Sequence, residues 1–290
     1  MRVLIVQLLV NGLITASFYA LAGVTWGVIY RTTHIFHFAH HLVFAAAGYA
    51  AVLLTAWTHV NYLFGFCAAV GIAMLLGCGM DAFLYRGLRR AGATQATTFL
   101  ASLGFGTAGV AVLLLAFTSS PRRLEGFPSK VLSIGEAFFS VADLTMVIVS
   151  WTLVGFLLLF LARSRYGKAI RAVGSNVGMA RNLGLNIDRL YLLVFAIGSG
   201  LFGAAAFLFT AKNVAYPTMG IHPFFMSFTA VFLGGVSSIP GHALAGFVLG
   251  FAENLGMLVL PGEYKTMIAF AILFVVIVVR PEGLMGFGRG

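Results

Sequence analysis

Three histidines near the start of the chain have side chains and a spacing that could support chemistry. His37, His40 and His41 stand at i, i+3 and i+4, which would place the imidazoles on one face of a helix. Imidazoles can ligate metals, but this segment lacks a carboxylate to complete such a site. Two other interpretations remain open: hydrogen bonding to a solute that passes the helix, and a structural role at the helix start.

A second candidate is the polar stretch Leu161–Arg189, which carries six of the eighteen lysines and arginines and the single acid Asp188. Apolar Ile170 and Val173 recur at helical spacing, while Lys168 and Arg171 take the other side. The stretch therefore predicts an amphipathic helix with one basic face.

A second short helix is expected directly after the first. Gly174 and Ser175 interrupt the pattern, Asn176 can cap a helix over Val177–Leu183, and Gly184 is suited to end it in the left-handed conformation. The prediction is a helix, a turn and a helix lying outside the membrane, at about residues 165–186.

The composition places the whole chain in a lipid bilayer. Of its 290 residues 60% are hydrophobic and only 9% are charged, whereas about 25% of a soluble protein is charged. The net charge of +10 could suggest nucleic acid as a partner, but the cations cluster beside apolar segments. Cytoplasmic loops enriched in lysine and arginine explain that charge, so no nucleic-acid partner is expected.

Neither a phosphate-binding loop nor an H-E-x-x-H or metal-type cysteine motif occurs. We therefore expect no enzyme activity, no metal and no cofactor in this chain, and any coupling to ATP must come from another chain. Cys67 and Cys78 lie eleven residues apart in one apolar segment, roughly 16 Å along a helix. They are too distant to form a disulfide with each other.

The expected architecture is all-α: a polytopic integral membrane helical bundle in one domain over residues 1–290, with about eight spans and one short or re-entrant helix. Spanning segments are predicted at Val3–Tyr30, Phe38–Trp57, Tyr62–Tyr85, Gln95–Phe117, Val141–Ala162 and Leu190–Ala211, with a shorter one at Met267–Val279. Phe224–Val236 and Ala243–Leu260 are separated by the breaker cluster Ser237–Gly241. The first of these two is short, so its crossing stays open.

The basic loops predict the orientation of the spans. Arg86, Arg89 and Arg90 follow the third span and Leu161–Arg189 follows the fifth, so both are expected in the cytoplasm. Counting crossings then places the loop 121–140 and the N-terminus outside. The C-terminus is cytoplasmic if the short segment completes a crossing.

Three stretches together resemble the permeases of branched-chain amino acid ABC transporters, specifically the LivH-type subunit of the LivH/LivM family. FHFAHHLVFAAAGYAAVLL at 36–54 is similar to the family's N-F-A-H-G-E…G-A-Y, and KAIRAVGSNVGMARNLGLN at 168–186 is similar to its coupling loop, A-I-R-A-V-A-E-N-P-E-A-A-R-L-x-G-I-N. VFLGGVSSIPGHALAGFVLGFAE at 231–253 and VRPEGL at 279–284 resemble its last motifs. Their order and spacing span nearly the whole chain.

The resemblance implies a multi-pass subunit of the bacterial inner membrane within an importer. The implied partners are a LivM-like second permease, LivG- and LivF-like ATPases and a periplasmic solute-binding protein, with alternating access driven by the ATPases. The implied ATPase-coupling residues are Gly167, Lys168, Arg171, Ala172, Asn176, Ala180, Arg181 and Gly184. Ser175, Val177 and Gly178 replace the family's Glu, Pro and Glu there, which bears on which ATPase binds.

Residues predicted to line the substrate path are His37, Phe38, His40, His41, Tyr49, Ser102 and Glu253. Glu253 is an ionisable residue within an apolar segment, so it should face the bundle interior. Its alternative role is a packing hydrogen bond to a serine or threonine on another helix. Ser102 stands where the family typically has threonine, and a hydroxyl facing the path is one interpretation.

The solute is expected to be a branched-chain or other apolar amino acid. His37, His41 and Leu42 replace the family's Asn, Gly and Glu, which removes a carboxylate and adds imidazoles, so an amide, urea-like or small aromatic carboxylate solute is the alternative. Two other classes of function fit the sequence less well. A membrane hydrolase lacks a paired nucleophile and base, and an ATP-independent carrier has no need of the basic helix pair.

Overall fold

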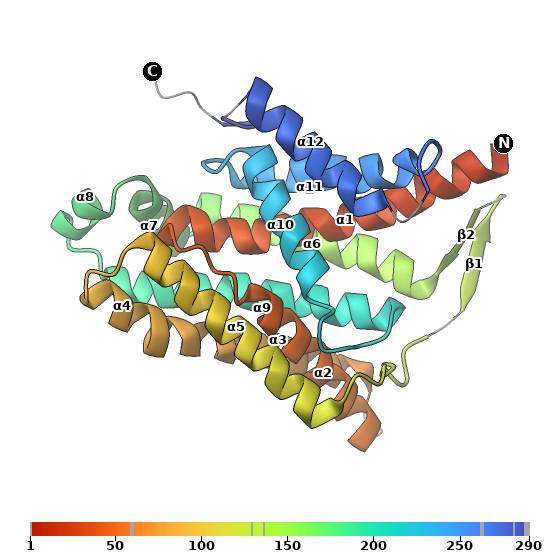
Figure 1. The fold of residues 1–290 in the computed structure, drawn as a ribbon, viewed down its shortest axis with the longest axis horizontal. Coiled ribbons are helices and arrows are strands. Elements are labelled where there is room, and N and C mark those ends of the chain that lie inside the picture. Colours follow the sequence, from red (N-terminus) through yellow and green to blue (C-terminus); the bar gives the residue numbers. More distant parts are fainter. Residues whose placement is uncertain are drawn as a thin grey trace. The chain divides into compact units, whose positions relative to one another are not determined.

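The structure is a computed structural model that describes residues 2–58, 61–128, 130–135, 137–261, 264–280 and 282–286. It is mostly helical (Figure 1). The helices are α1 (Arg2–Thr33), α2 (His40–Thr58), α3 (Tyr62–Gly79), the π-helix η1 (Met80–Tyr85), α4 (Arg86–Arg90), α5 (Gln95–Phe117), α6 (Val141–Arg163), α7 (Arg165–Ser175), α8 (Val177–Asn182), α9 (Ile187–Lys212), α10 (Ile221–Gly234), α11 (Ile239–Gly256) and α12 (Lys265–Val279).

Each apolar segment of the sequence forms a helix near its expected bounds. Within the described residues, five helices are long and apolar enough to cross a membrane, or six if the bent pair α10 and α11 counts as one span. The chain is thus a multi-pass membrane protein, while the expected number of about eight spans stays a prediction. The helix axis bends by 119° between α10 and α11, at the break that the cluster Ser237–Gly241 predicted. Ser238 Oγ caps α11 by accepting from Gly241 N at 3.1 Å.

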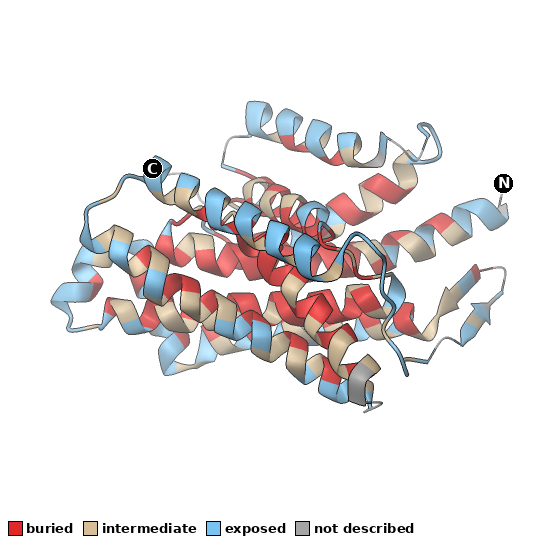
Figure 2. Ribbon diagram, turned by 60° about the horizontal axis from the view of Figure 1, so that its bottom comes forward, coloured by how far each residue is buried: buried red, intermediate tan, exposed pale blue. Residues whose placement is uncertain are grey.

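The chain divides into two compact units, each built from segments far apart in the sequence. Unit 1 comprises residues 1–27, 127–155 and 225–290, and unit 2 comprises residues 28–126 and 156–224. Each unit has its own buried residues, and Figure 2 colours the described residues by their burial.

The core of unit 2 is built on α2, α3 and α9, with α9 buried over most of its length. Glycines let α3 and α9 approach closely, because a Cβ on Gly203 would lie 2.6 Å from the Ala69 carbonyl oxygen and a Cβ on Gly77 would lie 2.9 Å from that of Phe195. Small residues permit such contact where lipid supplies no hydrophobic drive between helices.

In unit 1, α11 packs against the first part of α1, where Gly246 and Gly250 meet the backbone of Tyr19 and Ala16. The chain after α12 returns to the break between α10 and α11. Leu284 N donates to Leu233 O at 2.8 Å, and Met285 N donates to Gly234 O at 3.1 Å. Gly235 has a φ of +92° at this break, a conformation that glycine adopts without strain.

Unit 1 also holds a short hairpin, which the all-α prediction did not include. β1 (Val131–Ile134) pairs antiparallel with β2 (Ala137–Ser140), with Val131 opposite Ser140. The side-chain amide of Gln7 bonds to the backbone N and O of Phe138, each at 2.9 Å. Gln7 thus satisfies backbone groups of β2 as a neighbouring strand would.

Candidate functional site

The segment between α1 and α2 is irregular, and this places His37 outside any helix. His34 follows α1 with a φ of +55°, a conformation in which histidine is enriched among non-glycine residues, and Ile35 N bonds to Thr33 Oγ1 at 3.1 Å. α2 begins only at His40. The expectation that the three histidines share one helical face is therefore wrong for His37, because local bonds end the helix before it.

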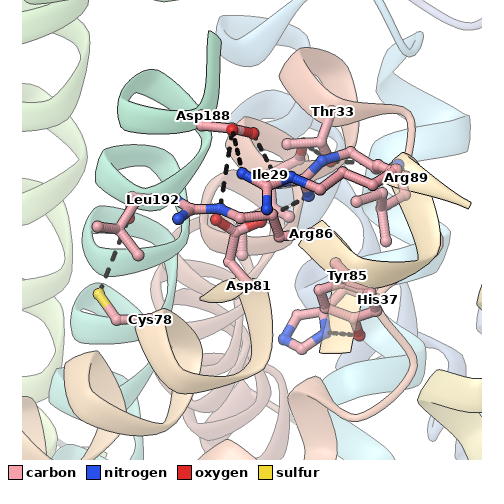
Figure 3. Close-up of polar contacts among 12 residues, drawn as sticks. Ile29, Thr33, His37, Cys78, Asp81, Tyr85, Arg86, Arg89, Asp188 and Leu192 are labelled. Carbon is pink, nitrogen blue, oxygen red and sulfur yellow. Dashed lines mark hydrogen bonds and ion pairs between the residues drawn. The ribbon is translucent and has the colours of Figure 1, made fainter. Parts of the chain in front are cut away.

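His37 is fully buried and belongs to a series of hydrogen bonds that joins three elements. Figure 3 shows the contact between His37 and Tyr85. His37 Nδ1 lies 2.7 Å from the Tyr85 hydroxyl at the end of η1, and Tyr85 donates to Ser102 Oγ on α5 at 2.8 Å. Ser102 Oγ also accepts from Ala39 N at 3.0 Å. Since the Tyr85 proton is directed to Ser102, His37 Nδ1 is the donor to Tyr85 in this arrangement.

The other two histidines are held by contacts of different kinds. His40 is fully buried and stacks on Phe202 with ring centroids 4.1 Å apart, and His41 Nδ1 lies 2.8 Å from Phe38 O. Phe38 is half-buried and packs against Phe224. Among the described residues, no group of three or more His, Cys, Asp or Glu side chains is placed to hold a metal ion.

The π-helix η1 directs two buried polar side chains from one short segment. Tyr85 faces His37, while Asp81, with no exposed surface, accepts from Arg89 Nη1 at 2.6 Å. The extra residue per turn of a π-helix shifts the faces of the helix beyond it, and such bulges recur at functional sites. Its ion pair with Arg89 gives Asp81 a structural role near the end of this helical segment.

Asp188, at the start of α9, is the centre of an arginine cluster (Figure 3). Its carboxylate lies 3.4 Å from Arg89 Nη2, 3.9 Å from Arg86 Nε and 3.8 Å from Arg90 Nη2. Arg89 therefore bridges Asp81 of η1 and Asp188 of α9. Sequence reasoning missed this bridge, because ninety-nine residues separate Arg89 from Asp188.

The polar stretch folds as the helix, turn and helix that its sequence predicts. Ser164 Oγ caps α7 by accepting from Gly167 N at 2.8 Å, and Asn176 Oδ1 caps α8 by accepting from Met179 N at 2.9 Å. Gly184 follows with a φ of +80°. These caps satisfy amide groups that have no partner within their own helix.

Most of the predicted ATPase-coupling residues lie on the surface. The exposed ones are Lys168, Arg171, Ala172, Asn176, Arg181 and Gly184, whereas Gly167 and Ala180 are buried. A Cβ on Gly167 would overlap the backbone of Phe160 and Leu161, so this glycine allows the tight turn from α6 into α7. Large side chains of Tyr166, Met179 and Leu183 are also exposed, by 64%, 63% and 74%. These exposed residues were not predicted from sequence, where their signal is an apolar residue type among polar neighbours.

The remaining path candidates are all buried within their own units. In unit 2, Tyr49 stacks on Phe117 with centroids 4.6 Å apart. In unit 1, Glu253 Oε2 accepts from the Tyr19 hydroxyl at 2.8 Å. One packing partner of Glu253 is thus a tyrosine on α1, a residue type that the prediction of a serine or threonine did not include. Contact of these residues with a solute stays a prediction.

Replacing Tyr85 with phenylalanine should lower the free energy of unfolding by about 1–3 kcal/mol, because buried groups of His37 and Ser102 lose a partner. Tyr166→Phe is the matched control, since Tyr166 is 64% exposed, and it should change little. Detergent-induced unfolding of the purified chain measures both. Equal stability of the Tyr85 variant and the wild type would show that the chain of bonds contributes nothing.

Known proteins place this architecture and these motifs among membrane permeases. The solved structure of PsaBC from Streptococcus pneumoniae in complex with Fab has the same fold, with a TM-score of 0.55 and 14% identity over 95% of this chain and 93% of that one. The branched-chain amino acid permease BraD of Pseudomonas aeruginosa is 31% identical, and LivH of Escherichia coli K12 is 30% identical, each over 97% of this chain and 95% of the relative. The autoinducer 2 import permease LsrC of an Enterobacter strain is 29% identical over 78% of this chain and 68% of its own.

The family assignment rests on nearly the full length of the chain. The family model described as the permease component of branched-chain amino acid transport systems matches residues 8–277. That range includes the histidine segment, the arginine cluster and both surface helices. The chain belongs to this family of transport permeases.

Proposed function

We propose that this chain is the membrane-spanning subunit of an ABC importer that takes up branched-chain amino acids, and that α7 and α8 couple it to the ATPases. The observation that carries the coupling role is the surface of this helix pair. Exposed Tyr166, Met179 and Leu183 stand among exposed cations. Apolar side chains in a segment too polar for lipid are suited to a protein partner.

The proposed assembly has a LivM-like second permease, LivG- and LivF-like ATPases and a periplasmic binding protein that delivers the solute. ATP and magnesium are bound by the ATPases, and this chain is non-catalytic. The names of the BraD and LivH relatives support branched-chain amino acids as the solute. His37, Leu42 and the other path candidates then belong to the surroundings of the solute path.

The proposed topology has the N-terminus outside, α7 and α8 in the cytoplasm and a cytoplasmic C-terminus. Two contacts within unit 2 support it. Arg89 and Arg181 line one cavity, so the loops after the third and fifth predicted spans share a side. Arg122 and Ala215 exchange backbone hydrogen bonds of 2.9 and 2.7 Å. The loops after the fourth and sixth predicted spans therefore lie together, on the side opposite to α7 and α8 in the proposed topology.

The count of about eight spans stays part of this proposal. α10 has 14 residues, about 21 Å at 1.5 Å per residue, which is shorter than a hydrocarbon core of about 30 Å. It is the short segment of the proposed topology. The cytoplasmic C-terminus requires that α10 and the break after it together reach the inner face.

The coupling role predicts the effect of a rigid insertion into this loop. A charged helical segment inserted after Gly174 should abolish ATP hydrolysis stimulated by the loaded binding protein, and uptake of leucine into reconstituted vesicles should fall to background. The physical reason is that Gly174 packs against the end of α1, where a Cβ would lie 2.9 Å from Arg31 O. The insertion therefore disrupts the last turn of α7, its contact with the end of α1 and its connection to α8.

The matched control is the same segment inserted after Gly126, a glycine with open space around it and a φ of +73°, in a loop on the proposed outer side. Transport and stimulated hydrolysis should survive there. Unaltered coupling in the Gly174 insertion, or crosslinks from Met179 that never reach an ATPase, would contradict the assignment.

A further inference from the structure

A cationic cavity lies in unit 2 where α4, α8 and the start of α9 meet. It has a volume of about 520 Å³, and its polar lining consists of Arg89, Arg90, Arg181, Asn186, Asp188 and Tyr191. Three aliphatic side chains complete the wall. Figure 1 shows the helices that form it, α4 and α8, at the same end of this unit.

The charges around this cavity do not balance. Asp188 is the one carboxylate of its lining against three arginines, and the ion pairs seen among the described residues leave Arg181 without a carboxylate. Arg89 also binds Asp81 behind the wall, but Arg86 is a further cation beside Asp188. Three arginines thus share two aspartates, and Arg181 adds a fourth positive charge. A partly enclosed site with such a surplus attracts an anion more strongly than an open surface does.

The position of the cavity along the spans indicates which anion it meets. The third predicted span, Tyr62–Tyr85, belongs to an apolar helical segment that runs on to Arg90 in the structure. On this segment Leu75 and Phe83 are 69% and 90% exposed. Such large apolar side chains are suited to contact with acyl chains, so the end of this span lies at the depth of the lipid headgroups. Tyr191 in the wall has the amphipathic ring that is enriched at this depth.

We propose that this cavity binds the phosphodiester headgroup of an anionic phospholipid of the cytoplasmic leaflet. Basic pockets between spans on the cytoplasmic side bind such headgroups, and guanidinium groups bond phosphate oxygens in pairs. Arg90, whose side chain is 73% exposed, and exposed Arg181 are the mobile ligands, while Arg89 is fixed by its two aspartates. The aliphatic wall accommodates the glycerol backbone.

A carboxylate from an ATPase is the alternative occupant, and two observations favour the lipid. A single carboxylate would fill little of a 520 Å³ cavity, and it would leave the aliphatic wall uncovered. The proposal rests on the cytoplasmic side assigned under the proposed function. It does not require that α7 and α8 couple to an ATPase.

The test is lipid retention by the purified full-length chain, measured by native mass spectrometry without ATPases. Phosphatidylglycerol should be retained over phosphatidylcholine with the same acyl chains. The double substitution Arg90→Gln and Arg181→Gln should weaken phosphatidylglycerol retention at least about tenfold, because charge-assisted bonds to the phosphate are lost. If the double variant does not fold, Arg181→Gln alone allows the same comparison.

The matched control is Arg163→Gln with Arg165→Gln, which removes the same charge from exposed positions outside the cavity lining. Its retention should equal that of the wild type. Equal losses in both double variants would overturn the site, and release of the lipid by millimolar inorganic phosphate would overturn the lipid in favour of free phosphate. Because no ATPase is present in this experiment, a failure of lipid retention would not contradict the coupling role of α7 and α8. Conversely, if crosslinks from Met179 never reach an ATPase, the lipid result is unaffected.

A crosslinker at residue 181 tests the other candidate occupant, a carboxylate of an ATPase. In the assembled transporter, this position is crosslinked to an ATPase with and without added phosphatidylglycerol. If the lipid does not reduce the yield of the crosslink, the proposal is overturned in favour of an acidic protein segment. Loss of that crosslink as phosphatidylglycerol is added would support the headgroup.

Discussion

Replacing Arg89 with glutamine is expected to lower the free energy of unfolding by about 3–5 kcal/mol, because it leaves the fully buried Asp81 carboxylate without its cation. Asp188, the second partner of Arg89, keeps Arg86 and Arg90 nearby, and its side chain is 43% exposed. Most of the loss should therefore come from Asp81. Unfolding of the purified chain in detergent, followed by tryptophan fluorescence, measures the change.

Two further variants show whether the buried charge is the cause. Arg90→Gln is the matched control, because Arg90 is 73% exposed and, within the described part of the chain, forms an ion pair only with Asp188. Exposed ion pairs contribute about 1 kcal/mol or less. Adding Asp81→Asn to Arg89→Gln should recover part of the lost stability, since the carboxylate is then removed as well. Equal losses for Arg89→Gln and Arg90→Gln would contradict the assigned role of Asp81.

The close packing of α3 on α9 predicts a comparably large effect from adding side chains to its glycines. Gly77→Leu should destabilise unit 2 by on the order of 3 kcal/mol or more, because even a Cβ at Gly77 would overlap the Ser199 hydroxyl and lie 2.9 Å from Phe195 O. A backbone oxygen of a neighbouring helix cannot move aside as a side chain can. The yield of folded chain after extraction and its unfolding in detergent are the measurements.

The same helix supplies the control for this packing. Gly79 has nothing within 4 Å of its Cβ position, so Gly79→Leu makes the same chemical change two residues away without a collision. It should fold at wild-type yield. If both variants lose the folded chain alike, helix propensity or membrane insertion is the cause, and the close approach of α3 to α9 is not.

Many elements of this fold could be predicted from sequence, because their signals are local. Apolar runs predicted the long helices, since the bilayer fixes how many consecutive apolar residues a span needs. Asn176 and Gly184 predicted the bounds of α8, because a cap and a left-handed glycine act on their own neighbours. The order of three motifs predicted the permease family before any contact was known.

The candidate site depended on contacts that no local pattern contains. Tyr19 and Glu253 are 234 residues apart, and the register that joins Tyr85 to His37 is set by a π-helix that sequence periodicity did not reveal. The histidines satisfied helical spacing, yet α2 starts only at His40. Contacts from α1 and α5 hold the segment before it, because Thr33 Oγ1 accepts from Ile35 N and Ser102 Oγ accepts from Ala39 N. Sequence thus determined the helices and the family, because hydrophobic length and capping act locally. The partners of the buried polar groups were decided by tertiary structure, because in a core without water each such group must bond to whichever segment the fold brings beside it.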